Sequence, residues 1–388
     1  MKKIDVVFNC STNVVGGGIQ NSVNFIVQVI KNDGFGLQWF FLLSPQVYAQ
    51  LKNILPENSF YIAKRSPASS FSARRQLKKL ITSLEPKFIY TSAGPAYIKF
   101  DVPHMMGCSN PYILGASTYA YRLYGNIIQQ FKRRLKSIYQ RMNIKKANVW
   151  VAQTEASQKQ LLNIVGKKAP VHIIYNSVAK EFLEFLTQAK PSANKILTSG
   201  TTSYSILVPT AYYKHKDLER IPEVAALLKK KFHANFKFIF TIESEVDYNK
   251  IINLAKGYEV ENCMENIGAF AHSKALEIYL RYDVVLQPSV LEVFSTTYIE
   301  AISTLKPLVV PNFEFARSIC GNYANYYDCN NIYSYVDALC NALQDTNLET
   351  RYNKAVQIAR RYGSQEQRSD KIVALIKEYL VKNEGKHV

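Results

Sequence analysis

The chain has 388 residues, of which 47% are apolar and 20% charged, a composition typical of folded globular proteins. Its length suits two domains better than a single core. The 48 lysines and arginines exceed the 30 aspartates and glutamates, and the resulting formal charge of +18 favours an anionic partner.

No stretch reaches the roughly 18 apolar residues that a membrane-spanning helix requires. Asp5 and Asn9 interrupt the apolar run that a signal peptide would need, so we expect a cytoplasmic protein. The six cysteines form no CxxC pair and accompany no histidine cluster. We therefore expect neither a zinc site nor a disulfide framework.

The N-terminal half alternates apolar runs with amphipathic stretches, which predicts βαβ units around a parallel sheet. The apolar runs predict strands at Lys3–Asn9, Leu37–Leu43, Lys87–Thr91, Val102–Gly107, Val149–Gln153 and Val171–Tyr175. After the first strand, the glycine-rich turn Gly16–Gly18 leads into a helix from about Gln20 to Lys31.

A second α/β series follows a mixed segment at 178–195, which contains Pro191 and which we assign as a linker. Strands are predicted at Ile206–Pro209, Phe236–Ile242, Asn262–Gly268, Val284–Gln287 and Leu308–Val310. Helices are predicted at Leu218–Lys231, Ser273–Arg281 and Thr296–Thr304. The fold class is therefore α/β, with one domain at 1–177, another at 196–363, and a charged helix at about 364–388 that packs back on the first.

The segment Tyr282–Asn312 carries the strongest chemical pattern in the chain. A buried strand ends at Pro288-Ser289, and ligands of open α/β sheets collect at the carboxyl ends of strands. Glu292 lies in the loop that follows, and Glu300 lies in the next helix. One carboxylate suits a ribose diol and the other a sugar, whereas the alternative is an ordinary surface helix with two solvated glutamates.

The start of that helix is a candidate phosphate site. Ser295, Thr296 and Thr297 stand there, where free backbone N–H groups and the positive end of the helix dipole favour an anion. The alternative is a capping sequence without a ligand.

This segment closely resembles the donor-site signature of the retaining GT-B glycosyltransferases of family 4, the group 1 glycosyltransferases. That signature has a Pro-Ser, two glutamates separated by seven residues, an alanine, and a proline six positions later. The matching residues here are Pro288, Ser289, Glu292, Glu300, Ala301 and Pro307. Further stretches that resemble the family are Val151–Gly166, Val171–Val178, Ala211–Lys230 and Ile267–Asp283.

The resemblance implies two Rossmann-like β/α/β domains that face each other across a cleft. It implies that Glu300 holds the nucleotide ribose and that Glu292 lies near the donor sugar. Lys216 would neutralise the diphosphate leaving group, a task that requires positive charge, so no metal is expected. The glycine loop with Gly17 and Gly18 would face the donor phosphate.

Two departures from the family pattern leave the sugar site open. Many relatives have an arginine shortly before the phosphate lysine, but Pro209–Tyr213 contains none, so Lys216 acts with Lys214 or alone. Many also have a histidine at the end of an N-terminal strand, near the sugar. Here His104 comes early in its strand and Ser109-Asn110 ends it. We treat these three as possible sugar or acceptor contacts, with a packed strand histidine as the alternative for His104.

A basic window occupies the middle of the N-terminal half, since no acidic residue lies between Asp101 and Glu155. Apolar residues at three- and four-residue steps predict an amphipathic helix there. They are Ile127, Ile128, Phe131, Leu135, Ile138, Tyr139 and Met142, and the cations between them are Lys132, Arg133, Arg134, Lys136 and Arg141. Either the apolar stripe packs on the sheet, or the cations face an anionic membrane surface and attach to it electrostatically.

The sequence thus predicts a retaining glycosyltransferase that moves a sugar from a nucleotide-sugar donor to a glycan acceptor, lipid-linked, in cell-surface polysaccharide synthesis such as O-antigen or capsule. It would be peripheral at the inner face of the membrane. An epimerase of GT-B architecture is one alternative, but it would leave the basic window without a purpose. A nucleic-acid-binding protein is another, although no nucleic-acid motif accompanies the charge and the paired carboxylates would repel a phosphate backbone. A dehydrogenase is disfavoured, because the glycine loop does not match GxGxxG.

Overall fold

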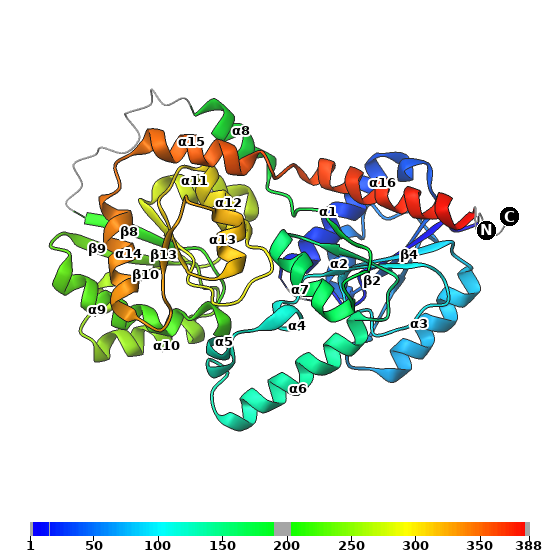
Figure 1. The fold of residues 1–388 in the computed structure, drawn as a ribbon, viewed down its shortest axis with the longest axis horizontal. Helices are drawn as coiled ribbons and strands as arrows, with labels where there is room; N and C mark the ends of the chain where they lie inside the picture. Colours follow the sequence, from blue (N-terminus) through cyan, green and yellow to red (C-terminus); the bar gives the residue numbers. More distant parts are fainter. Residues whose placement is uncertain (1–2, 15, 190–202, 385–388) are drawn as a thin grey trace. The chain divides into compact units, whose positions relative to one another are not determined.

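The computed structural model describes residues 3–14, 16–189 and 203–384, which divide into two compact units (Figure 1). Unit 1 takes its described residues from 1–115, 131–177 and 363–388, and unit 2 takes them from 116–130 and 178–362. Each unit is a parallel sheet with helices between its strands, which confirms the predicted α/β class. The chain passes between the units four times.

Unit 1 contains a seven-stranded parallel sheet in its described part, in the order β3-β2-β1-β4-β5-β6-β7. The strands are β1 (Val6–Asn9), β2 (Trp39–Leu43), β3 (Phe60–Ile62), β4 (Phe88–Gly94), β5 (His104–Cys108), β6 (Val149–Ala152) and β7 (Val171–Ile173). Strand β3 was not predicted from the sequence. This edge strand has only three residues, all half-buried, and therefore lacks the apolar run that marks the central strands.

The helices of unit 1 connect these strands. They are α1 (Gly17–Lys31), α2 (Pro45–Leu51), α3 (Phe71–Leu84), α4 (Pro111–Gly115), α7 (Glu155–Val165) and α16 (Gln365–Glu384), together with most of α6 (Ile127–Ile144). In α1, Phe25, Ile26 and Val29 are buried against the sheet at three- and four-residue spacing.

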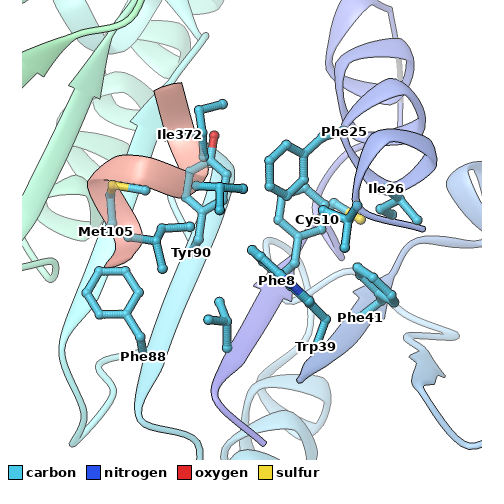
Figure 2. Packing of buried hydrophobic residues seen from close by; sticks show 14 of the residues in the cluster. Phe8, Cys10, Phe25, Ile26, Trp39, Phe41, Phe88, Tyr90, Met105 and Ile372 are labelled. Atoms are coloured by element: carbon cyan, nitrogen blue, oxygen red, sulfur yellow. The ribbon is translucent and has the colours of Figure 1, made fainter. Parts of the chain in front are cut away.

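The core of unit 1 is an aromatic cluster between β1, α1 and β4 (Figure 2). The ring centroids of Phe8 and Phe25 are 4.8 Å apart, and those of Phe25 and Tyr90 are 5.6 Å apart, which is the usual range for packed aromatic pairs. Helix α16 packs on α1 and contributes Ile372 and Ile376 to the same core. The C-terminal helix is therefore a part of the N-terminal unit.

Unit 2 contains a six-stranded parallel sheet in its described part, in the order β10-β9-β8-β11-β12-β13. The strands are β8 (Ser203–Val208), β9 (Asn235–Phe240), β10 (Met264–Asn266), β11 (Val284–Leu286), β12 (Leu308–Pro311) and β13 (Asn325–Tyr327). The α-helices are α5 (Thr118–Arg122), α8 (Lys180–Gln188), α9 (Ile221–Lys231), α10 (Glu245–Gly257), α11 (Ala275–Arg281), α12 (Thr296–Ser303), α13 (Glu314–Cys320), α14 (Ile332–Gln344) and α15 (Leu348–Ala359).

The segment assigned as a linker is partly helical. Residues 180–188 form α8, which packs on α12 and α15 and buries Phe182 and Leu186. An amphipathic pattern of only nine residues was too short to recognise in the sequence. Residues 190–195 of that segment, with Pro191, lie outside the described residues.

Both sheets have a point at which the strand order reverses. In unit 1 the reversal lies between β1 and β4, and in unit 2 it lies between β8 and β11. The loops that leave two such neighbouring strands diverge to opposite faces of the sheet, so a crevice opens at their carboxyl ends and ligands bind there. Within the described residues, no helix is long and apolar enough to cross a membrane.

Candidate functional site

Lys216 and Glu292 meet at the reversal point of the unit 2 sheet. Lys216 follows β8 and Glu292 follows β11, and these two strands are direct neighbours. The Lys216 Nζ lies 2.5 Å from the Glu292 Oε1, and the side chains are only 11% and 13% exposed. This pair places one positive and one negative charge at the edge where α/β sheets bind ligands.

Backbone hydrogen bonds join the two loops that carry this pair. The N–H of Val290 donates to the carbonyl oxygen of His215 at 2.9 Å, and the Ser289 hydroxyl lies 3.4 Å from the same oxygen. Lys214 does not join Lys216, because its Nζ forms an ion pair with Glu219 at 2.9 Å on the exposed side. Lys216 therefore stands with Glu292 rather than with a second cation.

Glu300 is buried in a separate cluster on α12. Its Oε2 accepts a hydrogen bond from the Tyr279 hydroxyl at 2.7 Å, and the residue is 7% exposed. Burial raises the pKa of the Glu300 carboxyl, and the Tyr279 hydrogen bond opposes that rise. Tyr279 was not predicted as a site residue, since nothing in a helical sequence marks which tyrosine will face a carboxylate 21 positions later.

The start of α12 lies where the sequence analysis placed a phosphate site. Ser295 occupies the N-cap position, Thr296 is exposed and Thr297 is buried. The Ser295 hydroxyl accepts a hydrogen bond from the Gln287 side chain at 3.2 Å, and it does not cap the first turn of the helix. The N–H of Tyr298 donates to the Ser295 carbonyl oxygen at 3.3 Å, so the Ser295 side chain leaves the backbone N–H groups of Thr296 and Thr297 uncapped.

The glycine loop of unit 1 leads directly into α1, which begins at Gly17. Gly16 has a φ of 61°, a conformation that residues with a Cβ rarely adopt. A Cβ added at Gly17 would meet no atom within 4 Å. Asn13 fixes the loop across the reversal point of the sheet, because its Nδ2 donates to the Gly18 carbonyl at 3.2 Å and to the Ser92 hydroxyl at 2.9 Å.

His104 is corrected from a possible sugar contact to a packing residue. It begins β5 and therefore lies at the amino end of the strand, opposite the edge where ligands bind. The side chain is 1% exposed, its Nε2 lies 2.9 Å from the Thr91 Oγ1, and its ring packs edge-on against Phe100. Burial lowers the pKa of His104 to about 3, so the imidazole is neutral.

Ser109 and Asn110 lie at the carboxyl end of β5, as the sequence predicts, and both are half-buried. The Asn110 Oδ1 accepts a hydrogen bond from the backbone N–H of Tyr112 at 3.0 Å and so supports the start of α4. These two residues stay candidates for acceptor binding.

Of the five cations predicted to face a membrane, Lys132, Arg134 and Lys136 are exposed on α6. Arg133 and Arg141 are corrected, because both turn toward α4. The Arg133 guanidinium lies 3.8 Å from the centroid of the Tyr112 ring, and the Arg141 Nε donates to the Ile113 carbonyl at 2.7 Å.

A partly buried polar cluster beside Lys216 was not predicted. The Tyr119 hydroxyl donates to the Asp217 Oδ2 at 2.7 Å, and the Arg220 guanidinium donates to the Tyr119 oxygen at 2.8 Å. Burial raises the pKa of Asp217 to about 6. The cluster attaches α5, from the N-terminal half of the sequence, to unit 2. The sequence shows Asp217 and Arg220 three positions apart. It does not show that Tyr119, about 100 residues earlier, contacts both of them.

Comparison with known proteins assigns the enzyme class. Residues 190–358 match the family model described as glycosyl transferases group 1. No curated protein matches the sequence significantly.

Solved structures match over almost the full chain. Sucrose-phosphate synthase from Thermosynechococcus elongatus has a TM-score of 0.70 at 12% identity, covering 98% of this chain and 100% of its own. A glycosyltransferase from Rickettsia africae has a TM-score of 0.67 at 15% identity, covering 99% and 100%. A trehalose-6-phosphate structure from E. coli, bound with UDP-2-fluoro glucose, has a TM-score of 0.63 at 11% identity, covering 96% and 99%.

These structures define the fold as GT-B, the architecture built from two Rossmann-like units. The residues that match the group 1 model include Lys216, Glu292 and Glu300, and this match together with the GT-B neighbours supports a glycosyltransferase enzyme.

Proposed function

We propose that this glycosyltransferase belongs to the retaining enzymes of family 4 and moves a sugar from a nucleoside-diphosphate sugar to a glycan acceptor. The observation that carries the donor half of the proposal is the Lys216–Glu292 pair at the reversal point of the unit 2 sheet. Retention is supported by the resemblance of Pro288–Pro307 to the signature of that family. The likeness to solved structures supports the fold only.

In this proposal, different residues of unit 2 bind different parts of the donor. Glu300 binds the ribose, and the first turn of α12, at Ser295, Thr296 and Thr297, binds phosphate oxygens through its backbone N–H groups. Lys216 turns from Glu292 to the diphosphate and stabilises the negative charge that develops on the leaving group. The proposed reaction needs no metal ion, because Lys216 supplies the positive charge.

Glu292 has a second task once Lys216 contacts the diphosphate. Its carboxylate then lies beside the anomeric centre, where negative charge favours the oxocarbenium-like character of a glycosyl-transfer transition state. Gly17 and Gly18 keep their predicted donor-binding role, and Ser109 and Asn110 keep theirs toward the acceptor.

The acceptor is proposed to be a lipid-linked glycan of a cell-surface polysaccharide such as O-antigen or capsule. The support is the basic window, in which Lys132, Arg134 and Lys136 are exposed and no acidic residue lies between Asp101 and Glu155. Such a surface attracts anionic lipid. The enzyme would then work as a peripheral protein at the inner face of the membrane.

The donor site is tested by binding. Calorimetry and thermal shift with UDP, GDP, ADP and CMP, with and without magnesium, should show one nucleotide that binds without metal. UDP is the first to test, because the E. coli structure holds a UDP-sugar. Glu300→Ala should abolish binding, whereas Glu277→Ala, at a glutamate of the same unit that is 57% exposed, should not. A folded protein that binds none of the four nucleotides would refute the proposed donor site.

A further inference from the structure

Helix α6 is drawn in teal in Figure 1. It presents its apolar face to solvent and its polar face to the protein. Seven large apolar side chains on it are between 40% and 82% exposed: Ile127, Ile128, Phe131, Leu135, Ile138, Tyr139 and Met142. At 100° per residue they fill an arc of roughly 120°. The residues buried on the other side include Ser137, Gln140 and Asn143. This orientation is the reverse of an ordinary surface helix.

The polar face is held in place by specific contacts, so the helix cannot roll over to bury its apolar stripe. The Gln140 Nε2 donates to the Tyr97 hydroxyl at 3.3 Å, and the Arg141 Nε donates to the Ile113 carbonyl at 2.7 Å. The Arg133 guanidinium stacks on the Tyr112 ring. Rotation would break all three contacts and bury charge. The interpretation in which the stripe packs on the sheet is therefore wrong.

A further exposed aromatic residue adjoins the stripe. Phe71, the first residue of α3, is 81% exposed. The Arg74 guanidinium lies 4.6 Å from the centroid of the Phe71 ring and 5.9 Å from that of the Tyr139 ring. Arg74 thus connects the start of α3 to Tyr139 of α6.

Cations border the apolar stripe on both of its sides. At 100° per residue, Lys132 flanks one side and Arg134 the other, with Lys136 beyond Lys132. Helix α6 contains no acidic residue at all. A broad apolar face between rows of cations matches the interface of an anionic bilayer, where acyl chains lie below and negative headgroups lie at the level of the cations.

We infer that α6, with Phe71, inserts its apolar face into an anionic lipid bilayer and lies in the plane of the interface. This inference deepens the membrane attachment in the proposed function and rests on it. It also changes its nature, because the sequence predicted attachment by charge alone. An apolar face of this size contributes a part of the binding that salt does not screen.

Vesicle sedimentation with the full chain separates the two contributions. Ile128→Ser/Phe131→Ser/Leu135→Ser should lower the partition coefficient on vesicles of phosphatidylcholine and phosphatidylglycerol by at least roughly a hundredfold, since three side chains that are 50–64% exposed lose the apolar transfer energy of their exposed part. The control Val246→Ser/Tyr333→Ser/Val381→Ser removes exposed apolar residues from three other helices and should bind as the wild type does.

Salt gives a second readout. In 1 M NaCl the wild type should keep measurable binding, and Lys132→Gln/Arg134→Gln/Lys136→Gln should lose its preference for anionic over neutral vesicles. Complete release of the wild type by salt, with unchanged binding of the serine variant, would overturn insertion in favour of adsorption by charge. A dimer that forms without vesicles and is lost in the serine variant, which still binds lipid normally, would assign the face to a second copy of the chain.

Insertion depth is measured with introduced tryptophans. The native Trp39 and Trp150 are buried, so Phe131→Trp should be quenched by lipids brominated on the acyl chain, and Tyr333→Trp should not. Equal quenching of both would contradict the inference. Nucleotide binding, measured on the same variants, should be unchanged. If the wild type binds no nucleotide, the proposed donor site is contradicted. The vesicle results would still test membrane insertion, because they do not depend on nucleotide binding.

Discussion

His104 offers a test in which the size of the effect follows from the structure. The buried imidazole has a pKa of about 3, against 6.5 for an ordinary histidine. Below pH 6.5 the unfolded chain therefore binds a proton that the folded chain does not. Stability is present in full above pH 6.5 and is lost as the pH falls toward 3. At pH 5 the loss from this residue alone is about 2 kcal/mol.

His104→Gln should remove that loss, since a glutamine amide can keep the hydrogen bond to the Thr91 Oγ1 and does not titrate. The assay is urea unfolding of both proteins between pH 8 and pH 5, followed by the fluorescence of Trp150, which lies on the neighbouring strand β6. The difference in unfolding free energy should shift by about 2 kcal/mol in favour of the variant. A difference that does not change with pH would show that His104 titrates normally, and the packing role would be refuted.

Three further outcomes follow from the site in unit 2. Lys216→Met should lower the unfolding free energy by about 2–3 kcal/mol, because it leaves the largely enclosed Glu292 carboxylate without its cation. Lys216→Met/Glu292→Gln should recover most of this loss, and equal losses for both variants in denaturant titrations would contradict the pairing. Glu300→Gln should leave the melting temperature at pH 7 unchanged or raised, because the buried charge of Glu300 is unfavourable there. The same variant should weaken nucleotide binding at least tenfold by calorimetry, and undiminished binding would exclude Glu300 from the donor site. Asp217, with a pKa of about 6 in the fold, costs stability as the pH rises from 4 to 6. Asp217→Asn should therefore gain about 2 kcal/mol over that range relative to wild type in urea titrations, and parallel pH profiles would count against the raised pKa.

The elements of the proposed donor region could be predicted because its pattern is local in sequence. The string from Tyr282 to Asn312 places a strand end, a carboxylate and a helix start within a few residues. Lys216 was predicted from the resemblance of Ala211–Lys230 to the first strand–loop–helix unit of the family's donor domain. The partners that define the environment could not be predicted in this way, because Tyr279 and Tyr119 reach Glu300 and Asp217 only through the folded backbone.

The orientation of α6 shows a different limit of sequence analysis. Periodicity establishes that a helix has two faces, but it does not say which face meets the protein. A clue was present in the neutral side chains Ser137, Gln140 and Asn143, which pack at an interface more readily than lysine or arginine does. The corrections of Arg133 and Arg141 have the same origin, because both follow the buried polar face.

The chain crosses between the two units several times, and these crossings determine which unit can complete its folding first during translation. Unit 1 needs α16 to complete its core, whereas unit 2 has all its residues once Tyr362 has been made. At roughly 5–20 residues per second, the first half of the sequence waits for about 10–40 seconds before its last helix emerges. The unit that is translated first is therefore completed last. During that interval Phe8, Tyr90 and their neighbours must be shielded from water by something other than α16.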